Sequence, residues 1–196
     1  MNARHLALVL VAISILTGGP AMAQDGLPTA TGLWQQIDDA SGESQGWFLI
    51  YEQSGIYEGA IAKMFFKPGE NENPICTRCQ GDQKDRPSLG LTIIKNMHRN
   101  GLNYENGTIL DPRDGNIYNA LMQLSPDGQT LTVRGYLGIA LFGRNQIWHR
   151  LPSSSLAQVD CPVIAEHAPA LLPAACRAAN APPQRRAPAR RALPVR

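Results

Sequence analysis

The chain has 196 residues and a formal net charge of +2, which is unevenly distributed. Residues 24–151 carry 11 Lys or Arg against 14 Asp or Glu, a net charge of −3, whereas residues 152–196 carry six Arg against Asp160 and Glu166, a net charge of +4. We therefore expect one mildly acidic domain, long enough to bury a core of its own, followed by a basic tail. No nucleic-acid partner is expected.

The first 23 residues have the layout of a secretory signal peptide. A charged start that contains Arg4 precedes an apolar run from Leu6 to Leu16, and Ala21-Met22-Ala23 supplies a small-x-small cleavage site. The apolar run is too short for a membrane-spanning helix, which needs about 20 residues. We expect cleavage after Ala23 and export to the periplasm or the medium, with no transmembrane segment in the mature chain.

Residues 31–151 alternate short apolar segments with residues that favour tight turns. In residues 46–51, Trp47, Leu49 and Tyr51 fall on one face of a strand, and Phe48 and Ile50 fall on the other. This pattern predicts eight strands, near residues 31–38, 45–52, 56–65, 90–97, 102–110, 116–124, 130–138 and 143–150.

The predicted fold is all-β, an eight-stranded antiparallel up-and-down barrel. Tight turns pair successive strands antiparallel, and closing the sheet removes two edges that would otherwise promote aggregation. A sandwich of two sheets fits the same strand spacing and is the alternative. The domain boundaries are then a signal peptide over 1–23, a barrel over 24–151 and a tail over 152–196. That tail is rich in Pro, Ala and Arg and is expected to be largely disordered, above all from residue 178 onward.

One connection, residues 66–89, is much longer than the others and contains Cys76 and Cys79. Cys161 and Cys176 lie after the barrel, and the proximity of the cysteines in sequence favours the pairs 76–79 and 161–176 among three connectivities. A redox-active pair would need a helix N-terminus, and a zinc site would need a second close pair. Neither is present, so we interpret the cysteines as structural disulfides. The histidines of the mature chain show no metal-ligand spacing, and no metal or cofactor is predicted.

Several motifs occur in an order that resembles a known family. They are Gly32-Leu-Trp-Gln-Gln-Ile-Asp38, Tyr57-x-Gly59-x-Ile61, Asn73-Pro-x-Cys-x-x-Cys79, Gly107-Thr-Ile-Leu-Asp-Pro112 with Gly115 and Tyr118, and Val133-Arg-Gly-Tyr-x-Gly138 with Gly143-Arg-x-Gln-x-Trp148. Together these motifs resemble the exported bacterial proteins grouped as domain of unknown function 2147. The resemblance spans residues 32–150 and implies a lipocalin-like, calycin-type barrel. The family has no settled activity, so the resemblance leaves function open.

The resemblance also implies how the barrel closes. Lipocalin-like barrels commonly begin with Gly-x-Trp, whose indole packs beneath the barrel against a basic side chain from the last strand. Gly32 and Trp34 match this start, Arg150 is the first candidate for the basic residue and Arg144 is the second. A guanidinium over an indole face is worth about 0.5–2 kcal/mol. We expect these residues, with Trp148 on the same strand, to have a structural role in closing the barrel.

Arg134 and Tyr136 are the candidates for ligand binding. Alternation places both on the strand face opposite Leu131 and Val133. If that polar face points inward, it lines a cavity suited to an acidic or amphiphilic ligand. If it points outward, which is the default for polar residues, the two are ordinary surface residues.

Three functions compete at this point. The leading hypothesis is a non-enzymatic exported module that binds a small hydrophobic or amphiphilic ligand in its barrel. The second is an envelope protein held to an anionic polymer or lipid by its basic tail. The third is an enzyme that uses the Cys76/Cys79 loop; no catalytic motif supports it.

Overall fold

The computed structural model describes residues 26–38 and 41–179. The predicted signal peptide, 1–23, and the arginine-rich end of the tail, 180–196, lie outside the described residues. In the described ranges, no helix combines the length and the apolar character that crossing a membrane requires.

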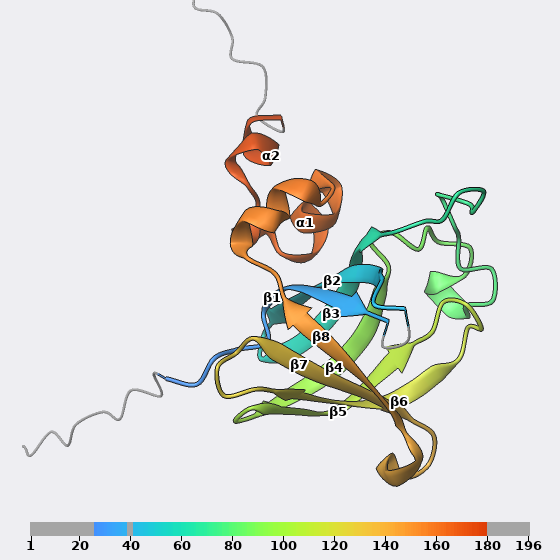
Figure 1. The fold of residues 1–196 in the computed structure, drawn as a ribbon, viewed down its shortest axis with the longest axis vertical. Helices are drawn as coiled ribbons and strands as arrows, with labels where there is room; N and C mark the ends of the chain where they lie inside the picture. Colours follow the sequence, from blue (N-terminus) through green and yellow to red (C-terminus); the bar gives the residue numbers. More distant parts are fainter. Residues whose placement is uncertain (1–25, 39–40, 180–196) are drawn as a thin grey trace, which may run out of the picture.

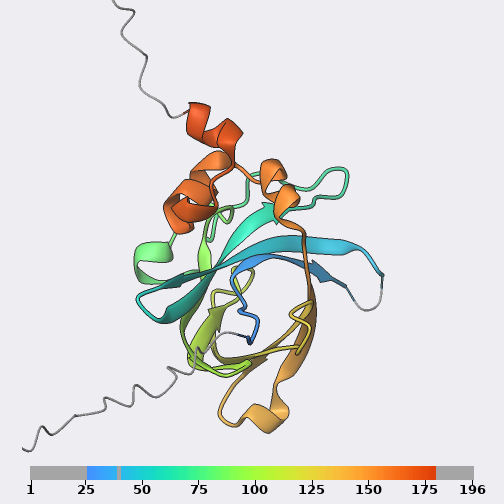
Figure 2. The ribbon, with the colours of Figure 1, turned by 90° about the vertical axis from the view of Figure 1, so that its left-hand side faces the viewer.

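Eight strands form one closed antiparallel barrel, in which every strand pairs with its neighbours in sequence and β1 pairs with β8 (Figures 1 and 2). They are β1 (Gly32–Ile37), β2 (Ser44–Gln53), β3 (Ile56–Met64), β4 (Thr92–Asn100), β5 (Asn103–Leu110), β6 (Ile117–Leu124), β7 (Thr130–Tyr136) and β8 (Arg144–Arg150). The predicted up-and-down barrel is confirmed, and its strand ends lie within three residues of the expected ones. The two-sheet sandwich is not the fold.

Turn chemistry determines where the strands reverse. Between β2 and β3, Gln53 pairs with Ile56, so only Ser54 and Gly55 remain for the turn. Both have positive φ, +54° and +83°. A type I′ turn, whose twist matches that of the flanking strands, requires positive φ at both of its central residues.

The barrel interior is filled by one face of each strand. The core cluster includes Trp34 from β1, Phe48 and Ile50 from β2, Tyr104 from β5 and Trp148 from β8. Trp34 and Tyr104 are 0% exposed, and the Phe48 and Trp148 rings stack at 4.2 Å between centroids. The interior at this level is therefore solid.

A second apolar cluster lies on the outside of β1, β2 and β3. Leu33, Trp47, Leu49 and Tyr51 belong to it, and they pack under the chain that follows β8. That chain forms η3 (Ser153–Gln158), α1 (Cys161–His167), η4 (Pro169–Leu171) and α2 (Ala174–Ala179), seen beside the barrel in Figure 1. β2 is apolar on both faces because each face meets a different core.

Residues 152–179 thus differ from the disordered tail expected for 152–196. Leu156, Val163 and Ile164 are at most 7% exposed, and the Cys161–Cys176 disulfide ties α1 to α2. His167 stacks on Tyr51 at 5.1 Å between ring centroids and lies 2.7 Å from the Gly90 carbonyl oxygen. Residues 178–196 are so rich in Pro, Ala and Arg that the composition of 152–196 as a whole predicts disorder, although residues 152–177 contain enough apolar side chains to pack on the barrel.

The long loop between β3 and β4 is ordered around its disulfide. Cys76 and Cys79 are bonded to each other, 0% exposed, and part of the interior cluster. Backbone bonds from Cys76 N–H to Arg86 O and from Asp85 N–H to Cys76 O fold the loop around them. The loop lies over the β5–β6 turn, where Gly115 approaches the backbone of Arg78 closely.

Candidate functional site

One end of the barrel is closed by Trp34 and Arg150. The guanidinium carbon of Arg150 lies 4.2 Å from the centre of the Trp34 ring, and the Trp34 indole donates to Ala30 O at 2.7 Å. The three guanidinium nitrogens donate to the carbonyl oxygens of Thr29, Thr31 and Gly128. Burial lowers the pKa of Arg150 somewhat from its very high ordinary value.

Gly32 makes this arrangement possible. Its φ is +131°, and a Cβ there would lie 2.8 Å from Nη1 of Arg150. A side chain at this position would therefore displace the guanidinium. Arg144, the other candidate for closure, lies at the opposite end of β8, paired with Gly135 and exposed. Arg144 takes no part in the contact with Trp34.

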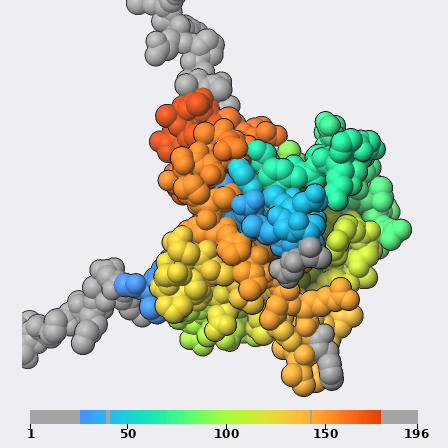
Figure 3. Space-filling view, viewed as in Figure 1, coloured from blue at the N-terminus to red at the C-terminus, as the bar shows by residue number. Residues whose placement is uncertain are grey.

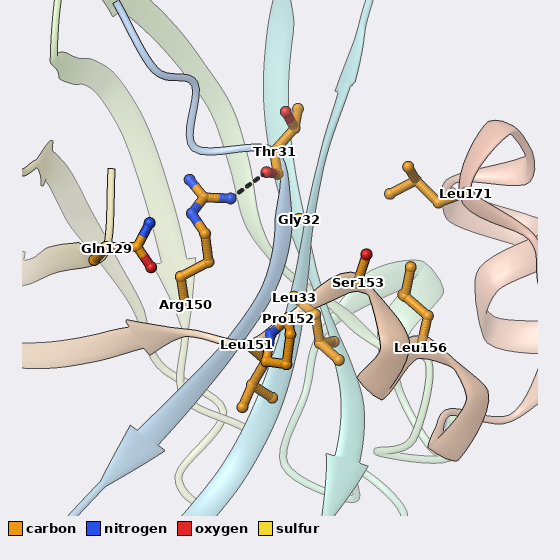
Figure 4. Close-up of a pocket in the computed structure, with 10 residues that line it drawn as sticks. All are labelled: Thr31, Gly32, Leu33, Gln129, Arg150, Leu151, Pro152, Ser153, Leu156 and Leu171. Carbon is orange, nitrogen blue, oxygen red and sulfur yellow. Dashed lines mark hydrogen bonds between the residues drawn. The ribbon is translucent and has the colours of Figure 1, made fainter. Parts of the chain in front are cut away.

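A groove of about 490 Å³ lies outside the barrel, between its closed end and the C-terminal segment. Leu151, Pro152, Leu156 and Leu171 contribute apolar surface to it. Figure 4 shows the Arg150 guanidinium beside this groove, with Nη1 bonded to Thr31 O. Because each nitrogen of that guanidinium already donates to a backbone carbonyl, Arg150 is held as a structural group.

The opposite end of the barrel carries the 66–89 loop and a set of inward-facing residues that are less deeply buried than the core. Residues paired across strands face the same side of a sheet, so pairing with interior residues shows which side chains point inward. Gln36 pairs with Trp148, Gln146 with Val133, Gly135 with Ala120 and Arg144, and Tyr118 with Ile109. We call this set the mouth: Gln36, Ile109, Tyr118, Gly135, Arg144 and Gln146.

Exposure distinguishes the mouth from the closed end. Arg144 is exposed and the other five mouth residues are half-buried, although all six face inward. The mouth combines an apolar side chain, two amides, a phenol and a cation. Asp114 accepts a bond from the Tyr118 hydroxyl at 3.0 Å and fixes that phenol. The backbone N–H of Asn116, first, and this hydroxyl lower the pKa of Asp114.

An unpaired hydrogen-bond donor lies beneath the mouth. Trp148 is 1% exposed, and its indole nitrogen has no hydrogen-bond partner among the described residues. Two other buried polar atoms share this condition, the Trp47 indole nitrogen and the Ser44 hydroxyl oxygen. Of the two tryptophans, Trp148 belongs to the interior cluster and Trp47 to the outer one. A buried donor without an acceptor is costly, about 1–3 kcal/mol.

Arg134 and Tyr136, the predicted ligand-binding pair, lie on the outer face of β7. Leu131 and Val133 belong to the interior cluster, so alternation turns Arg134 and Tyr136 away from it. The Arg134 side chain bonds to the loop that follows, at Ala140 O (2.7 Å) and Leu141 O (3.0 Å). The outward alternative considered from the sequence is the one observed.

Another cluster of polar side chains lies beside α1. A groove of about 250 Å³ beside α1 is lined by Glu58, Glu166, Lys95 and His167, among others. The Tyr51 hydroxyl bonds to Glu58, and burial, the largest cause, raises the pKa of Tyr51 well above its ordinary value. Across residues 26–38 and 41–179, no group of His, Cys, Asp or Glu is arranged to hold a metal ion.

Sequence reasoning found the closure pair but missed the mouth. Gln36, Tyr118 and Gln146 occur in the motifs that carry the family resemblance, but an amide or a phenol in a motif does not by itself indicate a binding role. The signal available was the spacing of Arg144, Gln146 and Trp148 in Gly143-Arg-x-Gln-x-Trp148, which puts all three on one face of a strand.

Comparison with known proteins agrees with this architecture. The profile of a family described as "Uncharacterized protein conserved in bacteria (DUF2147)" matches residues 32–150. No curated protein matches the sequence. A solved structure, described as "Protein HP1028 from the human pathogen Helicobacter pylori belongs to the lipocalin family", matches with a TM-score of 0.58 and 14% identity. The match covers 68% of this chain and 91% of that one, and at this identity it supports the fold alone.

Proposed function

The chain belongs to the DUF2147 family, and we propose that it is a non-enzymatic exported protein that binds a small amphiphilic molecule in the mouth of its lipocalin-like barrel. The observation that carries the proposal is the Trp148 indole N–H, buried inside the barrel without an acceptor among the described residues. Because Trp148 is 1% exposed, the side chains above it must move apart for a ligand oxygen to reach the indole, and that oxygen would then satisfy the donor.

The mouth defines the class of ligand. Ile109 is half-buried and apolar, the stacked Phe48 and Trp148 rings lie below it in the core, and Gln36 and Gln146 offer hydrogen bonds. Arg144 adds a cation at the rim, four residues from Trp148, or about 13 Å along an extended strand. We therefore propose a ligand with a carbonyl or carboxyl oxygen near its buried end and a polar or anionic group at the rim.

Export and a structural role for the cysteines fit the same proposal. Two disulfides suit an oxidising compartment, and we propose the periplasm or the medium as its location. The buried Cys76–Cys79 pair supports a structural disulfide over a redox site. Envelope association through the basic tail stays a prediction, because residues 180–196 lie outside the described residues.

Trp148→Phe is expected to weaken amphiphile binding about tenfold, because it removes the indole donor and keeps an aromatic ring. The measurement is isothermal titration calorimetry of the mature protein with dodecanoate and with dodecanol. Dodecanoate is expected to bind more tightly than dodecanol, since its carboxylate is the stronger acceptor for the indole N–H.

Trp47→Phe is the matched control. It removes the other buried, unpaired indole N–H among the described residues, but in the outer cluster. Its affinity for dodecanoate is expected to equal that of the wild type. Equal affinities for all three proteins would reject a ligand on Trp148. Native mass spectrometry of protein purified from its exported fraction would separately reveal a co-purified ligand, and a bare mass would count against one.

A further inference from the structure

The loop between β7 and β8 projects from the barrel at the end where the mouth lies. In Figures 1 and 3 it forms the protrusion at the bottom of the view, and it includes η2 (Ala140–Phe142). Its side chains Leu137, Ile139 and Leu141 are 67%, 59% and 76% exposed. We call residues 137–143 the tip. Single exposed apolar residues are ordinary, but three within seven residues form a patch.

The tip is held in shape by polar contacts at its base. Arg134 donates through Nε to Ala140 O, through Nη2 to Leu141 O and through Nη1 to the Asn145 side chain. Gly143 N–H donates to Ala140 O at 3.0 Å. These bonds pair the carbonyl oxygens of Ala140 and Leu141, which would otherwise bond to water. The apolar side chains of the tip stay exposed to solvent. A patch that is already ordered loses little conformational entropy when it binds.

The β7–β8 hairpin carries charge of one sign. No Asp or Glu occurs on the β7–β8 hairpin, residues 130–150, whereas Arg134 and Arg144 lie at the base of the tip. Arg144 follows the tip directly and is exposed. The rest of the barrel domain is acidic, with a net charge of −3 over residues 24–151 from 11 basic and 14 acidic residues. The hairpin itself therefore carries only positive charge, which favours contact with a negative surface.

We propose that the tip docks on an anionic lipid bilayer, with Leu137, Ile139 and Leu141 inserted among the headgroups and Arg144 at the anionic surface. Apolar side chains flanked by cations, with the backbone groups already bonded, are the features that favour the membrane interface. The proposal rests on the tip and not on ligand binding. If the mouth binds an amphiphile as proposed above, docking would place that mouth against the bilayer, so that the ligand could transfer without crossing water.

The test is co-sedimentation of the full mature protein with phosphatidylcholine vesicles, with and without about 30% phosphatidylglycerol. Binding is expected on the anionic vesicles and to weaken severalfold as NaCl rises from about 0.05 to about 0.5 M. The variant Leu137→Ser/Ile139→Ser/Leu141→Ser is expected to bind at least about 30-fold more weakly. Arg144→Gln is expected to bind the anionic vesicles about fivefold more weakly than the wild type.

A matched control replaces three exposed apolar residues elsewhere. Leu27→Ser/Ile147→Ser/Leu171→Ser alters side chains that are 55%, 42% and 38% exposed and lie outside the tip. Its vesicle binding is expected to equal that of the wild type. Equal binding by the tip variant, or an equal loss in both variants, would overturn the proposal.

A reporter variant removes the ambiguity of a folding defect. Leu141→Trp is expected to show a blue-shifted emission with anionic vesicles and no shift with neutral ones. Unshifted emission with anionic vesicles would overturn lipid docking. A concentration-dependent dimer that the triple Ser variant of the tip abolishes would overturn it as well, and would show that the tip binds a second copy of the protein. Calorimetry with dodecanoate distinguishes a failure of lipid docking from a failure of ligand binding. The triple Ser variant of the tip changes none of the six mouth residues, so it is expected to bind dodecanoate as the wild type does.

Discussion

Removal of residues 152–196 is expected to leave a chain that does not fold stably. The deletion uncovers the outer faces of β1, β2 and β3, where Leu33, Leu49 and Ala60 are at most 2% exposed. Burying one large apolar side chain is worth about 1.5–3 kcal/mol, and four of this cluster, Leu33, Trp47, Leu49 and Tyr51, lie on β1 and β2 alone. That sum is comparable to the whole stability of a domain, about 5–15 kcal/mol. Urea unfolding and sedimentation of the soluble fraction would measure the loss.

The deletion of residues 180–196 alone is the control. The two described core clusters are formed by residues 30–172, so this deletion is expected to leave the urea midpoint unchanged. Ile164→Ala tests the same contact by one side chain. Ile164 is 0% exposed, so the substitution is expected to cost about 2–5 kcal/mol. A soluble, cooperatively folding 24–151 fragment would show that the C-terminal segment is dispensable.

The fold was predictable because strand periodicity and turn chemistry agree along the whole barrel. Trp47, Leu49 and Tyr51 share one face of β2 as the alternation indicated, but no local rule states what covers them. That cover is Leu156, Val163 and Ile164, in a segment whose Pro, Ala and Arg content reads as disorder. The composition of a segment is an average over all its residues. Whether the segment packs on the barrel depends on a few apolar side chains and on the Cys161–Cys176 disulfide.

The closure pair and the mouth differ in how the sequence encodes them. Trp34 and Arg150 follow a spacing carried by the family resemblance, and their contact is present at 4.2 Å. The mouth is assembled by register: Gln146 faces inward because it pairs with Val133, and Gln36 because it pairs with Trp148. The inward direction of each amide can be inferred once its partner on the neighbouring strand is known.

Arg150→Met is expected to lower the free energy of unfolding by about 2–4 kcal/mol. Methionine keeps the apolar stem over the indole, so the loss reports on the charge and on three donated bonds. The carbonyl oxygens of Thr29, Thr31 and Gly128 each lose a donor, and the cation leaves the Trp34 face. Because Arg150 joins the entry of β1 to the β6–β7 turn and the end of β8, the change weakens barrel closure itself.

Arg144→Met is the matched control on the same strand. Arg144 is exposed at the opposite end of β8 and away from Trp34, so its substitution is expected to change stability by less than about 0.5 kcal/mol. Both values come from urea unfolding at fixed protein concentration, with unchanged slopes as the test of two-state behaviour. A loss below about 1 kcal/mol for Arg150→Met, or an equal loss for both variants, would mean that the guanidinium contributes nothing to barrel closure. Packing and strand pairing alone would then close the barrel.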